Sequence, residues 1–257
     1  MIDSHTHLSD EAFSQDLPQV LQRAQAAGVN RFVVVGQDLA ENRKVLGMAE
    51  QDERLLPFLG LHPDRFADRA PAISEAEIAD ILQLIRSEAG RINGIGEVGL
   101  DYWVCQEADR RDAQREAFSA LVDLARETDL PLNVHSRSAG HHTIDLLLEK
   151  NAGRVLMHAF DGKAGHALRG AEAGLVFSIP PSIARSPQKQ KMVRALPLSA
   201  MVLETDSPVL GPEKGTRNEP ANLAVSVQWI ARIKGVEEEE VRETTLRTTR
   251  TLFGLKD

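Results

Sequence analysis

Short apolar runs alternate along the chain with longer amphipathic segments. Eight runs have the character of buried strands: Ile2 to His7, "RFVVVG" from Arg31, "LLPFLGLH" from Leu55, "INGIGEVGL" from Ile92, "LPLNVH" from Leu130, "RVLMH" from Arg154, "GLVFSI" from Gly174 and "MVLETD" from Met201. Between them, stretches such as "ISEAEIADILQLIRSEAG" place apolar residues at three- and four-residue spacing, which is typical of amphipathic helices. Eight buried strands that alternate with helices predict a parallel sheet, and eight strands close a (β/α)8 TIM barrel.

A doubly wound open sheet is the alternative α/β fold. Such a sheet usually carries a glycine-rich phosphate loop after its first strand, whereas this sequence places His5 and His7 there. We find no internal repeat, no low-complexity tract and no Pro/Gly/Ser-rich bridge in the 257 residues. A TIM barrel uses about 250 residues. We therefore predict one barrel domain over residues 1–257.

Titratable side chains stand where the predicted strands end, which is the edge where barrel enzymes carry their chemistry. The first strand ends in His5 and His7, the fourth in Glu97, the fifth in His135, the sixth in His158 and the eighth in Asp206. Burying so many titratable groups side by side is costly unless a cation compensates their charge. Cys105 is the only cysteine, so the ligands of such a cation must be nitrogen and oxygen atoms.

Six ligands are too many for one tetrahedral catalytic ion and suit two ions bridged by a carboxylate. Glu97 is the candidate bridge. The two histidines of the first strand and Asp206 would hold one ion, since the first and eighth strands are neighbours in a closed barrel. His135 and His158 would hold the other. Imidazole and carboxylate ligands are compatible with Zn, Mn, Ni, Co or Fe, so the ligand types alone do not identify the metal.

The chemistry expected of this site is hydrolysis. A metal-activated water attacks a phosphorus or carbonyl centre that the second ion polarises, and Asp206 orients that water or takes its proton. Glu97 is the second candidate catalytic residue, together with Asp206, because it would bridge the two ions. Two divalent ions outweigh the two carboxylates, so the pocket should attract an anionic phosphoester.

Further residues near the same edge are candidates for contact with the substrate. His62 either binds substrate or fixes the loop before Pro63. Arg137 follows His135 by two residues and faces the same way, which suits a bidentate phosphate contact. Arg217 either binds phosphate or caps the next helix.

Two carboxylates are candidates for orienting the ligand histidines, namely Asp101 and Glu204. The basic stretch "RSPQKQKMVR" from Arg185 is interpreted most simply as a solvated helix face, although Arg185 itself lies close to the rim.

Charge and composition narrow the range of expected substrates. The net charge of -8 argues against a broad electrostatic footprint on duplex DNA and favours single-stranded ends or small nucleotides. Aromatic residues make up only 4%, with Tyr102 and Trp103 the one pair near the rim, which also favours a short substrate. The start "MIDSHTH" lacks a basic region and an apolar region, and no run approaches the roughly 18 apolar residues of a spanning helix. We expect a cytoplasmic protein with no membrane partner and no obligate protein partner.

Seven motifs together resemble a known family. They are "DSHTHL", "GLHP", "GEVGLDY", "NVHSR", "HAFDG", "LETDSP" and "RNEP", in this order from residue 3 to residue 220. The sequence resembles the TatD-like metal-dependent hydrolases, described as deoxyribonucleases, among the amidohydrolase-type barrels. Within that family it is most similar to the subgroup called TatD DNase domain-containing protein 3.

The resemblance implies a (β/α)8 barrel with two divalent ions, held by the six residues already found at the strand ends. Many members carry a Cys and a Ser or Thr where this chain has Ala159 and Asp161. The extra carboxylate of Asp161, near the place where a substrate phosphate would bind, is expected to narrow or change the range of substrates.

Three hypotheses for function follow. The leading one is a dinuclear phosphoesterase of the TatD deoxyribonuclease type, acting on nucleic-acid ends or small cyclic nucleotides. The second is a hydrolase of carboxylic esters, such as an ester to the end of a tRNA, or of C–N bonds, with the same two ions. The third is a metal-binding protein without turnover, which the presence of Asp206 argues against.

Overall fold

Eight parallel strands form one sheet in the order of the sequence, in a computed structural model that describes residues 1–256. The strands are β1 (Ile2–Thr6), β2 (Arg31–Val35), β3 (Leu55–Leu59), β4 (Gly94–Gly99), β5 (Leu132–His135), β6 (Val155–Met157), β7 (Val176–Ile179) and β8 (Met201–Leu203). The first and last strands meet through a parallel bridge between Thr6 and Ser207. The Asp206 amide also donates to the His5 carbonyl oxygen at 3.0 Å. The predicted (β/α)8 barrel is confirmed, and the open doubly wound sheet is excluded.

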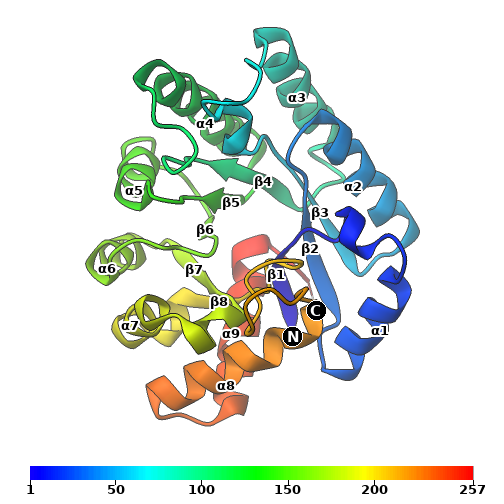
Figure 1. Ribbon diagram of the computed structural model, residues 1–257, viewed down its shortest axis with the longest axis vertical. Helices are drawn as coiled ribbons and strands as arrows, with labels where there is room; N and C mark the ends of the chain where they lie inside the picture. Colours follow the sequence, from blue (N-terminus) through cyan, green and yellow to red (C-terminus); the bar gives the residue numbers. More distant parts are fainter. Residues whose placement is uncertain (257) are drawn as a thin grey trace.

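Helices surround this barrel (Figure 1). They are α1 (Leu17–Ala26), α2 (Leu39–Gln51), α3 (Glu75–Glu88), α4 (Ala108–Thr128), α5 (Gly140–Glu149), α6 (Ala164–Glu172), α7 (Pro187–Ala195), α8 (Leu223–Lys234) and α9 (Glu238–Phe253). Side-chain caps fix several starts: Asp38 accepts the Glu41 amide at 2.9 Å, and Ser74 accepts the Glu77 amide at 3.1 Å. Gly235 ends α8 with a φ of 67°, a left-handed conformation in which glycine avoids the strain of a side chain. These local signals fix the starts of α2 and α3 and the end of α8.

Two apolar clusters divide the core according to the alternation of side chains along a strand. Phe32 and Val34 of β2 belong to the larger cluster, which the helices cover. Val33 and Val35 belong to a smaller cluster contributed by several strands, which therefore fills the barrel interior.

Helix α9 contributes to the interior cluster from outside the barrel. Its last turn adds Leu252 and Phe253, and the Phe253 ring meets Phe58 edge-on at 5.0 Å between centroids. Figure 1 shows α9, in red, beside β1 and β8 and inside the ring formed by the other helices. The barrel interior is apolar, so the polar end of the barrel is the end formed by the carboxyl ends of the strands.

In the described residues, we find no helix with the length and apolar character needed to cross a bilayer.

Candidate metal centre

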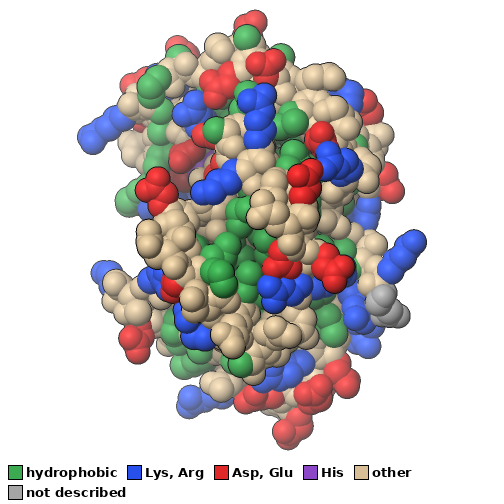
Figure 2. Space-filling model, turned by 90° about the vertical axis from the view of Figure 1, so that its right-hand side faces the viewer, with side chains coloured by type: hydrophobic (Ala, Val, Ile, Leu, Met, Phe, Trp, Pro, Cys, Tyr) green, Lys and Arg blue, Asp and Glu red, His purple; other side chains and the backbone are tan. Residues whose placement is uncertain are grey.

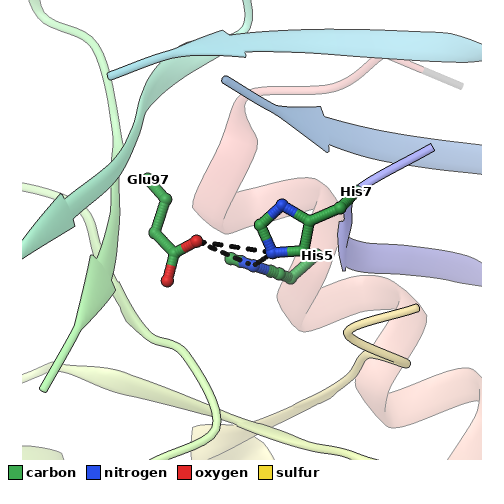
Figure 3. Close-up of side chains that lie close together, drawn as sticks. All are labelled: His5, His7 and Glu97. Carbon is green, nitrogen blue, oxygen red and sulfur yellow. Dashed lines mark hydrogen bonds and ion pairs between the residues drawn. The ribbon is translucent and has the colours of Figure 1, made fainter. Parts of the chain in front are cut away.

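The two histidines that open the chain point toward Glu97 from the opposite wall of the barrel. Figure 3 shows His5 and His7 at the end of β1 and Glu97 on β4. The two Nε2 atoms are 3.2 Å apart, and Glu97 Oε2 lies 3.5 Å from that of His5 and 3.4 Å from that of His7. His5 and Glu97 are buried. Three ligand atoms at this spacing form a group that could hold one ion.

His158, which follows β6, and Asp206, which follows β8, extend this group. The His158 ring stacks on His5 with 3.5 Å between centroids. Asp206 Oδ1 lies 3.3 Å from His7 Nε2 and 3.6 Å from His5 Nε2. Asp206 has a left-handed φ of 56°, a conformation that Asp tolerates better than most residues and that often marks a functional site. His5, His158 and Asp206 form a second group of ligand spacing.

The other oxygen of Glu97 faces a different set of histidines. Oε1 lies 2.7 Å from His135 Nδ1, 3.4 Å from His62 Nε2 and 3.6 Å from His158 Nε2. His62, Glu97 and His135 form a third group of ligand spacing. The structure thus brings together all six residues proposed from the strand ends. It also places His62 among them, a residue expected either to contact substrate or to fix the loop before Pro63.

Hydrogen bonds on the outer nitrogens hold the histidine rings. His5 Nδ1 lies 2.8 Å from Asn133 Oδ1, and the amide of Asn133 in turn donates to the Ser4 carbonyl oxygen at 2.9 Å. His158 Nδ1 lies 2.8 Å from Glu204 Oε2. An Nδ1–H that donates outward leaves the Nε2 lone pair directed at the cluster, which is the tautomer a metal requires.

The two carboxylates expected to orient histidines do contact them. Glu204 contacts His158, and Asp101 Oδ2 lies 3.0 Å from His135 Nε2. Asn133 is a functional candidate that the sequence analysis missed. Its position two residues before His135 on β5, and so on the same face of the strand, is the signal that could have identified it.

Charge in the cluster is balanced by protons on histidines. Burial opposes protonation of His5, but the Glu97 and Asp206 carboxylates outweigh it and raise its pKa to about 9. Burial likewise opposes protonation of His62, and Glu97 and Asp64 raise the pKa to about 10. For Glu97, the histidines overcome the effect of burial and hold the pKa well below its ordinary value.

These observations fit a cation site. Within the part of the chain that the structure describes, the ion pairs of Glu97 and Asp206 are with histidines and include no lysine or arginine. A purely structural buried carboxylate would be expected to pair with a permanent cation. In the absence of such a cation the carboxylates favour protons on His5 and His62, and divalent ions can replace protons because metal binding displaces them from its ligands.

A cavity of about 590 Å³ opens over the cluster and is lined by His7, Glu97, Asp206, Arg137 and Lys189 among others. Arg137 is thus where the sequence analysis expects it, with its guanidinium carbon 5.1 Å from the Trp103 ring centroid. Lys189 corrects the interpretation of the basic stretch as a solvated face, because this side chain is only 7% exposed. Its Nζ donates to the Ala159 carbonyl oxygen at 2.9 Å.

The structure does not bring Arg217 to this cavity. Its guanidinium donates to both oxygens of Asp16, at 2.8 and 2.7 Å, and to the Ala12 carbonyl oxygen at 2.6 Å. The nearby carboxylate therefore holds Arg217 against the loop that precedes α1. The contact with substrate that the sequence analysis considered for Arg217 has no support in this geometry.

Comparison with known proteins identifies the family. Residues 2–254 match the family model described as TatD related DNase. The chain belongs to the TatD family. It is 43% identical over 260 residues to human deoxyribonuclease TATDN3, covering 98% of this chain and 94% of the human protein. It is 32% identical over 267 residues to the 3'-5' ssDNA/RNA exonuclease TatD of Klebsiella pneumoniae, covering 99% and 98% of the two chains.

A solved structure shows the same TatD-family barrel. The crystal structure of the TatD homologue YJJV from Escherichia coli superimposes with a TM-score of 0.91 at 27% identity, covering 100% of this chain and 98% of that one. The family expected from the seven motifs is confirmed, and the protein is accordingly a metal-dependent hydrolase.

Proposed function

We propose that this TatD-family protein is a dinuclear phosphoesterase that cleaves nucleic-acid ends or small nucleotides. The observation that carries the proposal is the position of Glu97, whose two carboxylate oxygens face two different sets of histidines. A carboxylate placed in this way can bridge two ions. The printed names of the human and Klebsiella relatives, a deoxyribonuclease and a single-strand exonuclease, support the same substrate class.

The ligand assignment follows the two sides of Glu97. His5, His7 and Asp206 would hold the ion on the Oε2 side. His135 and His158 would hold the ion on the Oε1 side, where His62 Nε2 is also within reach. Divalent ions bound there supply Lewis acidity, which activates a water and neutralises charge on a phosphoryl oxygen.

The protein's own side chains provide proton transfer and binding. Asp206 lines the cavity with its carboxylate and is the group placed to accept a proton from the attacking water. Burial raises the pKa of Asp206, but His158 and His7 hold it below its ordinary value, so the carboxylate is ionised. Arg137 lines the same cavity and supplies a guanidinium for a substrate phosphate.

Surface charge favours a short or single-stranded substrate over long duplex. The protein carries a net charge of -8. On the face seen in Figure 2, basic and acidic side chains are interspersed and form no continuous basic stripe. Binding to duplex DNA without sequence preference needs many phosphate contacts from lysine and arginine. The 59% exposed Trp103 beside Arg137 offers instead one stacking surface for a base near the cavity.

A metal and substrate panel tests the proposal. Metal bound per chain is measured by mass spectrometry after loading with Zn, Mn, Ni, Co or Fe in turn. Each loaded form is assayed on single-stranded and duplex oligonucleotides blocked at either end, cyclic nucleotides, an aminoacyl ester and a cyclic amide. We expect two ions per chain and cleavage of phosphodiesters.

Two results would overturn the proposal. Saturation at about one ion would remove the bridged site on which the mechanism depends. Cleavage of the ester or the amide without any phosphodiester would favour the carboxylic-ester or C–N hydrolase. The Asp206→Asn variant serves as the control for contaminating nucleases, because it should be inactive on every substrate.

A further inference from the structure

Lys189 is a nearly buried cation whose side chain lines the metal cavity. It lies in the first turn of α7, where its amide donates to the capping Ser186 Oγ at 3.3 Å. Among the described residues its Nζ makes one hydrogen bond, to the carbonyl oxygen of Ala159, the residue that follows His158. An ammonium group has three N–H donors, so two remain for a ligand in the cavity.

The cost of burying Lys189 calls for an anionic partner. Within residues 1–256, no carboxylate lies within ion-pair distance of its Nζ, unlike the surface lysine Lys150, which pairs with Asp123. The amino end of α7 adds the positive end of a helix dipole at the same place. A buried ammonium at a helix amino terminus is a favourable environment for phosphate.

A second, independent observation points to a ligand in the same cavity. Ser136 is 3% exposed and lines the cavity between His135 and Arg137. Among the described residues its Oγ has no hydrogen-bond partner. A buried hydroxyl without a partner is costly unless something supplies the missing bond. The wall of the cavity therefore contains a buried hydroxyl without a partner on the β5 side and an ammonium with spare donors on the α7 side.

Asp161 adds a negative charge to the part of the cavity around Lys189. It lines the cavity, is exposed, and accepts the Ser138 amide at 3.3 Å through Oδ2. Its carboxylate acts electrostatically on Lys189 without contacting it, as do Glu204, whose effect is larger, and Asp206. The extra carboxylate that distinguishes this chain from many family members is thus partly balanced by a buried lysine.

We propose that Lys189, together with Ser136, forms a subsite for a phosphate group of the substrate, and that Asp161 limits the affinity of that subsite. The proposal rests on the proposed phosphoesterase function and assigns its phosphate recognition to residues outside the metal ligands. It predicts effects of opposite sign: loss of the lysine weakens phosphate binding, and loss of the Asp161 charge strengthens it.

The test uses orthophosphate as the probe of the metal-loaded protein. Its dissociation constant is measured by calorimetry, and its inhibition constant against a phosphodiester is measured in parallel. Lys189→Met should weaken both about 10- to 100-fold, the range expected for one charged hydrogen bond. Asp161→Asn should strengthen both by roughly two- to fivefold, as removal of one partly screened like charge predicts.

Lys191→Met is the matched control, because Lys191 is exposed on the same helix and should leave both constants unchanged. Lys189→Arg keeps the positive charge and should recover part of the affinity. Metal content and the unfolding midpoint of each variant show whether the site is intact. If Lys189→Met does not fold, the proposal is tested by whether Asp161→Asn strengthens or weakens the binding of phosphate.

The outcomes separate this inference from the proposed function. Equal phosphate affinity in the wild type, Lys189→Met and Lys191→Met would overturn the subsite while leaving phosphodiester cleavage in place. Unchanged or weaker phosphate binding in Asp161→Asn would also contradict it. Failure of the wild-type protein to cleave any phosphodiester would instead overturn the proposed function.

Discussion

Removing the negative charge of Glu204 should weaken metal binding without disturbing the fold. Glu204 is fully buried behind the cluster, where Oε2 contacts His158 Nδ1 at 2.8 Å and accepts the Ser178 hydroxyl at 2.6 Å. Its Oε1 accepts the Ala159 amide at 2.9 Å. Glu204→Gln preserves the shape and can keep a carbonyl acceptor for His158, so the change removes the charge together with the acceptor of the Ala159 amide.

The magnitude follows from the contact that is altered. A hydrogen bond to a charged group contributes about 1.5–3 kcal/mol, and replacing it by a neutral one forfeits a large part of that. Each 1.4 kcal/mol is about a tenfold change in an equilibrium constant. We therefore expect the ion held by His158 to bind about 10- to 100-fold more weakly, in agreement with the usual effect of changing a residue that orients a metal ligand.

Competition with a chelator of known affinity measures this loss, and mass spectrometry gives the ion count. Ser178→Ala is the matched control, since it removes another bond to the same oxygen but leaves the contact with His158. Its effect should be several times smaller. Two ions held in Glu204→Gln as tightly as in the wild type would refute the role assigned to Glu204.

Four further predictions concern other parts of the molecule. Asp206→Asn should keep the fold but lose turnover, and a variant with full metal content and normal activity would contradict this. His5→Ala should lower the count from two ions to one, with the His135 and His158 ion weakened but retained; two ions in that variant would show that His5 is structural. Because the pKa of His5 is raised to about 9 in the metal-free protein, its ring carries a proton below that pH, so metal affinity should fall as pH falls and binding should release protons. Calorimetry in two buffers of different ionisation enthalpy measures that release, and an affinity independent of pH would contradict it. Phe253→Ala should lower the free energy of unfolding by about 3–5 kcal/mol, measured by denaturant titration, with an unchanged ion count.

The sequence predicts most of the metal centre because a barrel gathers the ends of its strands. His135 and Asp206 are 71 positions apart in the chain, yet the alternation of strands and helices is enough to place them at one edge. The same rule finds Glu97 as the shared carboxylate, because it lies close to the carboxyl end of the fourth strand.

The residues that the sequence could not place depend on loops and helix orientation. Lys189 stands in a basic stretch, and nothing in that stretch tells which side of α7 faces the cavity. Arg217 lies in a long loop, where the competing carboxylate of Asp16 is brought near only by the folded structure. His62 precedes a short 3-10 helix that turns its Nε2 toward Glu97, a direction that strand periodicity does not give.

The packing of α9 links the histidine pair after β1 to a helix that is made much later. Ile2, three residues before His5, shares the interior cluster with Leu252 and Phe253. The outer edge of β1 also has no strand partner until β8 has been synthesised. At about 5–20 residues per second, roughly 12 to 50 s separate the emergence of His5 from that of Phe253. Until α9 has been made, the nascent chain therefore carries its histidine pair without the neighbours that fix its geometry, and the proposed metal centre can take its final form only after that point.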